Sequence, residues 1–257
     1  LNVAADTQVI RVEPLGDRTQ IGAPPEIDAT VLLENLDTGE QISLTDFPTT
    51  VGGEDALVHN FWTTFSIDPS TSYRITVQEE GEPVTTVSTT TPTQAPSLSH
   101  DNGFLLPCLF PNSPSNQRKP PNTFVVTAQG VDRIAVADVI YPISFGSFQT
   151  RRKFSHYGGI EQEGDFFRIP VFYRPDLVNL NPSPPPGPRK ECAGFGDFTN
   201  PHAFVAVASG GPDWPEEWRG VPFSQIASPD TFSNVQGGHG YVGGIYSDTI
   251  KVPLRAR

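Results

Sequence analysis

The sequence lacks methionine, contains few lysines and carries no long uninterrupted apolar run. A helix that crosses a bilayer needs about 18 or more apolar residues, so no such helix is predicted. The formal net charge is −12 and the basic residues form no stripe, which argues against nucleic acid or anionic lipid as electrostatic partners. The missing initiator methionine predicts a processed chain, as after removal of a signal peptide.

Motif spacings typical of metal, nucleotide and hydrolase sites are also missing. The chain has no CxxC, CxxH, HExxH or GxSxG, and no D-x-D-x-D-G calcium loop. Its five histidines are scattered without an i, i+4 pair, and each is expected to be hydrogen-bonded or solvated: His59, His100, His156, His202 and His239. We therefore predict no catalytic residue, no metal site and no cofactor, and we expect that the protein is not an enzyme.

Turn-forming residues are abundant in this sequence. The chain has 27 prolines and 23 glycines among 257 residues, with 36% apolar residues. This composition favours short strands joined by turns over long helices. Arginine outnumbers lysine, which together with the prolines is typical of a secreted or thermally stressed protein, although genome composition produces the same bias.

Only two cysteines occur, Cys108 and Cys192. In an exported protein they predict a disulfide, which in the chain-entropy model would stabilise the fold by roughly 4 kcal/mol. Two unpaired thiols remain the alternative.

The first 90 residues show short alternating or β-branched segments separated by turn residues. The predicted strands are residues 7–13, 28–34, 41–45, 56–67, 72–79 and 83–90. A hairpin is predicted at Leu36 to Glu40, where Asp, Thr and Gly supply turn chemistry. The number and spacing of these strands predict an Ig/transthyretin-like β-sandwich over residues 1–95.

A polar, proline-punctuated stretch at residues 89–99 predicts a linker, or else a last strand that runs into a loop. Beyond it we expect a second, larger β domain with little helix, residues 96–257. Its predicted strands are residues 122–129, 133–143, 165–174 and 203–209. Residues 181–188 predict a stiff polyproline loop, and residues 213–218 predict one or two helical turns.

A glycine-rich segment with interleaved aromatics, residues 232–246, marks the C-terminal region. Its glycines are Gly237, Gly238, Gly240, Gly243 and Gly244. A phosphate loop would precede a helix, whereas the residues that follow here form a predicted strand. The segment is therefore interpreted as a structural turn that joins the last strands of the second domain, held by positive φ or close backbone contacts.

Adjacent aromatic pairs recur in the predicted strands, among them Phe61 with Trp62 and Phe166 with Phe167. Neighbouring residues of a regular strand point to opposite faces, so one member of each pair lies outside its own sheet's core. We expect the outer aromatics to be covered by the other domain, a subunit or a membrane partner.

Three stretches resemble the surface lipoproteins of the Bacteroidota known as the DUF4249 family. They are residues 27–40 (IDATVLLENLDTGE), residues 73–77 with 90–92 (YRITV and TTP), and residues 232–246 (FSNVQGGHGYVGGIY). Tyr241 and Val242 depart from the family's usual residues. The chain also begins with Leu1 instead of the acylated cysteine of a lipoprotein. Either the expected lipid anchor with its cysteine has been trimmed from the printed sequence, or the protein is not lipidated.

The resemblance implies an exported accessory or binding protein on the extracellular face of the outer membrane, or secreted. Its expected partner is a β-barrel, such as a TonB-dependent receptor. The family implies no catalytic residues. Our alternative expectation is a structural subunit of an extracellular filament or other assembly, in which strand edges pair between copies.

Overall fold

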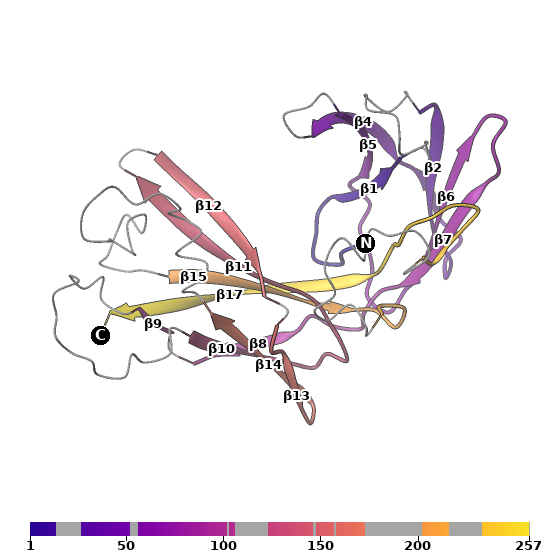
Figure 1. Cartoon of the computed structure of the whole chain (residues 1–257). Helices are drawn as coiled ribbons and strands as arrows, with labels where there is room; N and C mark the ends of the chain where they lie inside the picture. Colours follow the sequence, from indigo (N-terminus) through magenta and orange to yellow (C-terminus); the bar gives the residue numbers. More distant parts are fainter. Residues whose placement is uncertain are drawn as a thin grey trace. The chain divides into compact units, whose positions relative to one another are not determined.

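The computed structural model describes residues 1–13, 27–51, 56–101, 103–105, 123–145, 148–156, 158–172, 202–215 and 233–256. These residues form strands β1 to β17 and no helix (Figure 1). The prediction of an all-β chain with little helix is confirmed. Of the stretch predicted as one or two helical turns, residues 213–215 are described: residues 212–214 form a turn, with the Trp214 amide donating to the Gly211 carbonyl at 3.0 Å, and residues 216–218 lie outside the described residues.

The chain divides into two compact units that alternate along the sequence. The first unit contains Leu1–Gln94 and Gly210–Tyr246, and the second contains Ala95–Ser209 and Ser247–Arg257. The predicted division at residues 95 and 96 placed all later residues in one domain. The structure differs from it at Gly210–Tyr246, because a strand in this stretch pairs with a strand of the first unit.

Two sheets build the first unit. One has the order β1 (Gln8–Val12), β5 (Ala56–Thr63), β4 (Thr45–Val51). The other has the order β16 (Val235–Gln236), β7 (Thr85–Thr90), β6 (Ser72–Glu79), β2 (Ala29–Asn35), β3 (Gln41–Ser43). All described pairings within these two sheets are antiparallel.

The hairpin between β2 and β3 forms where its turn chemistry predicts it. The Asn35 side-chain oxygen accepts hydrogen bonds from the amides of Asp37 and Thr38, at 3.0 and 3.1 Å. Gly39 has a φ of 76°, a conformation that costs glycine little.

Strand β4 was not predicted as a strand. It contains Pro48, and β4 lies at the edge of its sheet, where proline is tolerated because a ladder runs along only one side of the strand.

The first unit has one hydrophobic core to which both sheets contribute. Alternation in β2 and β6 buries Val31, Leu33, Tyr73 and Ile75, while Phe61 of β5 faces them from the other sheet. Phe61 is 2% exposed and its neighbour Trp62 is 38% exposed. The pair thus points to opposite faces, as predicted. The assignment to an Ig/transthyretin-like sandwich stays a prediction.

Two further sheets build most of the second unit. One has the order β13 (Glu161–Glu163), β14 (Phe166–Phe172), β10 (Thr123–Gln129), β8 (Ser97–His100). The other has the order β12 (Phe148–Ser155), β11 (Ile134–Phe145), β15 (His202–Gly210), β17 (Ile245–Ala256), β9 (Gly103–Leu105). Figure 1 shows β11, β15 and β17 side by side. Strand β8 occupies part of the stretch predicted as a linker.

The second core also draws on both of its sheets. Its members include Phe124, Val139, Phe167, Ile169 and Val205, each fully buried. Phe167 is buried whereas its neighbour Phe166 is partly exposed, again as the pairing rule predicts. The predicted polyproline loop at 181–188 and the cysteines Cys108 and Cys192 lie outside the described residues, so the disulfide stays a prediction.

Candidate binding groove

The glycine-rich segment joins the first unit through a short strand. Val235 pairs with Val87 and Gln236 with Thr86, which places β16 at the edge of its sheet. The Thr85 hydroxyl donates to the Gly237 carbonyl at 3.0 Å. The glycine-rich segment is therefore part of the first unit's sheet, where the sequence alone placed it among the last strands of the second domain.

Two glycines of this segment adopt backbone conformations that other residues rarely take. Gly237 has a φ of 78° and Gly240 a φ of 144°. A Cβ on Gly237 would also lie 2.6 Å from the Val84 carbonyl oxygen. Both positions therefore require glycine for conformational reasons, and Gly237 requires it for space as well.

Two other glycines allow close packing. A Cβ on Gly244 would lie 2.6 Å from the Thr90 carbonyl oxygen, and one on Gly243 would lie 2.7 Å from the Trp214 ring. The Gly244 amide donates to the Thr89 hydroxyl at 2.9 Å. This half of the segment is pressed against β7 and Trp214.

Asn234 closes the loop that these glycines form. Its side-chain nitrogen donates to the Val242 carbonyl at 2.7 Å, and its side-chain oxygen accepts from the Val242 amide at 3.1 Å. The backbone amide of Asn234 donates to the Gly240 carbonyl at 3.2 Å. Residues 234–242 thus form a loop with fixed ends, which we call the Asn234 loop. Asn234 was not predicted as a site residue, although an asparagine beside glycines is a common turn signal.

Aromatic contacts support the loop from one side. Tyr241 meets Trp214 edge-to-face with ring centroids 5.6 Å apart, and its hydroxyl donates to the Asp213 carbonyl at 2.9 Å. The Asp213 carboxylate accepts a hydrogen bond from the Thr90 amide at 2.8 Å. These contacts attach residues 213–214 to β7 as well as to the loop.

The Asn234 loop borders an open groove of about 450 Å³, within the size range of small-molecule sites. The groove lies entirely in the first unit, between the edge strand β1 and the β6–β7 side of the second sheet. Its described lining residues include Ile10, Arg11, Val12, Glu13, Ile27, Ile75, Val77, Glu79, Glu82, Thr85, Thr86, Val87, Val235, Gly237, Gly238, His239, Gly240, Tyr241 and Val242.

The floor of the groove is an open part of the hydrophobic core. Val12, Val77, Val235 and Val242 are only partly buried, and all four pack against the core cluster of the first unit. They come from three different places in the sequence, namely β1, β6 and the Asn234 loop. Apolar surface that remains in water in this way is available to a ligand, since covering it is favourable.

The rim of the groove carries an excess of negative charge. Among the described lining residues, Glu13, Glu79 and Glu82 are acidic, and Arg11, the single arginine of this set, lies 3.8 Å from Glu13. His239 is exposed at the rim, where the flanking glycines leave its ring accessible. The groove therefore suits a ligand with apolar groups and positive charge.

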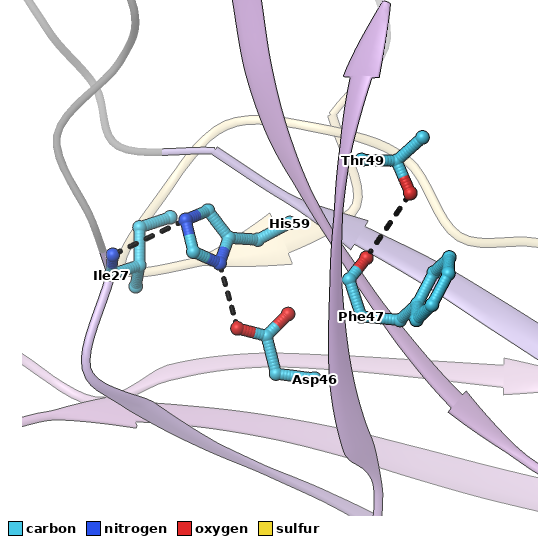
Figure 2. A network of polar contacts seen from close by, with 5 residues as sticks. All are labelled: Ile27, Asp46, Phe47, Thr49 and His59. Carbon is cyan, nitrogen blue, oxygen red and sulfur yellow. Dashed lines mark hydrogen bonds and ion pairs between the residues drawn. The ribbon is translucent and has the colours of Figure 1, made fainter.

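His59 contacts one of the residues that line the groove, Ile27. Figure 2 shows the His59 ring between Asp46 and Ile27. Its Nδ1 lies 2.8 Å from the Asp46 carboxylate, and its Nε2 lies 3.4 Å from the Ile27 amide. Nε2 must accept from that amide, so we assign the proton to Nδ1, which donates to Asp46. His59 is 2% exposed, so it is not available to a ligand. We assign it a structural role, because its ring positions Ile27, which lines the groove.

Of the predicted glycines, Gly237, Gly238 and Gly240 line the groove, whereas Gly243 and Gly244 pack behind it.

The described residues contain no group of three or more His, Cys, Asp and Glu side chains placed to hold a metal ion. Among the same residues, no helix has the length and apolar character to cross a membrane. The part played by β1 was missed, because nothing in its sequence indicates that it faces a distant loop.

No family model matches the chain, and no curated protein matches it. The resemblance to the DUF4249 family therefore stays a prediction.

Proposed function

We propose that this protein is a non-enzymatic, exported binding protein that holds a partner in the groove between β1 and the Asn234 loop. The observation that carries the proposal is the floor of this groove, where four valines of the first core remain only partly buried. A groove with an apolar floor and charged rim provides contact area and orientation, which is what a binding site needs.

The cellular setting rests on the sequence. The acidic, arginine-biased and proline-rich composition supports export, and the resemblance to DUF4249 lipoproteins supports the outer surface of the outer membrane. In this setting the partner would be a β-barrel such as a TonB-dependent receptor. The protein would act as its accessory subunit, with the groove as the point of attachment.

A specific observation also favours our second candidate, a structural subunit of an extracellular assembly. The outward face of the β1–β5–β4 sheet carries three exposed apolar side chains: Val9 at 60%, Phe47 at 60% and Trp62 at 38%. Val9 and Thr45 both lie opposite Trp62, and Phe47 lies opposite Asn60, two residues from Trp62, so the three apolar residues share this face. Contact between copies would cover it.

Two substitutions on one strand separate these candidates. Val12→Glu places a charge on the groove floor, whereas Val9→Glu places the same charge on the outward face of the same strand. The native protein and both variants would be isolated from membranes in mild detergent, and the co-purifying protein identified by mass spectrometry. We expect Val12→Glu to lose the partner and Val9→Glu to keep it.

The opposite result would overturn the groove as the binding site. Ordered polymers that disappear with Val9→Glu, in the absence of any partner, would favour the structural subunit. Thermal unfolding of both variants provides the folding control, since each places one charge on the same edge strand.

A further inference from the structure

We propose that the ligand of this groove is an extended segment of a partner polypeptide, which adds to β1 as a further strand and carries Lys or Arg among alternating apolar residues. This inference rests on the proposed function, because it names the kind of partner that the groove binds.

The first reason is that β1 lies at the edge of its sheet. Among the described strands, β1 has a single neighbour, β5, to which it pairs over its full length from Gln8 to Val12. The other side of an edge strand presents backbone donors and acceptors in the spacing of a ladder. Five residues of strand extend about 16 Å, long enough to guide a segment of similar length.

The second reason is the position of the apolar floor. Val12 belongs to β1 itself, while Val77 and Val235 belong to the sheet on the far side of the groove. Successive side chains of a strand point to opposite faces, so every second side chain of an added strand would enter the groove. A volume of about 450 Å³ accommodates a few side chains and excludes a folded domain.

The third reason is the charge of the rim. Within the described part of the lining, Glu13, Glu79 and Glu82 outnumber the single arginine, Arg11. Charge complementarity of this kind chiefly sets specificity and the rate of association, while each exposed pair adds only about 0–1 kcal/mol. A segment with Lys or Arg at its solvent-facing positions would therefore be selected over an acidic one.

These features favour a separate partner over a second copy. The chain has a formal net charge of −12, so two copies repel one another. Residues 1–3 are bound within their own unit and are not available for exchange between copies, since the Val3 amide donates to the Ile245 carbonyl at 2.9 Å.

Synthetic peptides test the inference directly on the full chain. The probe is a peptide of about seven residues that alternates Val with Lys. One control replaces Lys by Glu, and another keeps the sequence but carries N-methyl groups on alternate backbone nitrogens that face the edge. Affinities would be measured by fluorescence anisotropy for the native chain, Val12→Glu and Val9→Glu.

We expect the Lys peptide to bind the native chain and Val9→Glu equally. The Glu peptide, the N-methylated peptide and the Val12→Glu variant should each lower the affinity by about tenfold or more. Hydrogen exchange should show new protection of β1 amides on binding of the Lys peptide. Unchanged exchange at β1, or equal binding of the N-methylated peptide, would overturn strand addition.

Two outcomes separate this inference from the proposed function. If the native partner depends on Val12 but no peptide competes with it, the groove is a binding site and strand addition is wrong. If neither the partner nor the peptides depend on Val12, both proposals fail. Concentration-dependent self-association that Val12→Glu abolishes would show that the occupant is a second copy, contrary to the inference.

Discussion

The two hydrophobic cores of this protein differ in how completely they are sealed. In the second unit, valines such as Val126, Val139 and Val205 are fully buried, and the four partly buried residues around the core come from separate places. In the first unit, Val12 and Val77 stay partly exposed at one groove. A core that is open on one side buries less apolar surface, so it contributes less to the free energy of folding and leaves apolar surface available for binding.

The strongest test of this difference compares one substitution in each core. Val126→Ala, in the sealed core, should lower the free energy of unfolding by about 2–3 kcal/mol because it leaves a cavity. Val77→Ala, at the open side, should lower it by about 1 kcal/mol or less, because water already reaches the site. Denaturant unfolding of both variants measures the two values. Equal losses would show that the first core is sealed in solution.

A second test concerns the contact between the glycine-rich segment and β7, behind the groove. Gly244→Ala should lower the free energy of unfolding by about 1–3 kcal/mol, because its Cβ would lie 2.6 Å from the backbone oxygen of Thr90. Gly158→Ala is the matched control, since nothing lies within 4 Å of its Cβ and its φ is not positive. If Gly244→Ala leaves the free energy of unfolding unchanged, the glycine-rich segment is loosely held against β7.

The smallest expected effect concerns Tyr73 at the centre of the open core. Burial raises the pKa of Tyr73, whose hydroxyl oxygen accepts a hydrogen bond from the Asp68 amide at 2.8 Å. An unfolded tyrosine ionises near pH 10, so the unfolded chain releases this proton first and stability falls as the pH rises above that value. The slope contributed by Tyr73 is at most about 1.4 kcal/mol per pH unit.

Unfolding at pH 9 to 11 would measure this slope by comparison with Tyr73→Phe, which cannot ionise. If the free energy of unfolding falls with pH equally steeply in Tyr73→Phe and in the native protein, Tyr73 does not contribute to the slope. That result would indicate that water reaches Tyr73 and that the opening extends to the centre of the core.

Much of the fold could be predicted because its signals are local. Strand β6 alternates in sequence, and Asn35 to Gly39 carry the turn chemistry of a hairpin, so both were expected. Strand β4 was missed because Pro48 argues against a strand unless the strand lies at an edge, and edge positions depend on distant pairing.

The candidate site shows the same division between local and distant signals. The conformational demands on Gly237 and Gly240 follow from glycine itself and were anticipated. Their place in the first unit was not anticipated, because it depends on the pairing of β16 with β7. The groove likewise requires β1 and the Asn234 loop to meet, and neither segment indicates the other in its sequence.

The return of the chain to the first unit has a consequence for its synthesis. Thr85 and Gly237 form a hydrogen bond although 152 residues separate them. At ordinary rates of translation, roughly 8–30 s pass between the appearance of these two residues. During that interval β7 has an open edge and the groove has only one wall. A nascent chain of this kind is exposed to wrong pairing, and it gains from export or chaperone binding that delays folding until residue 246 has been made.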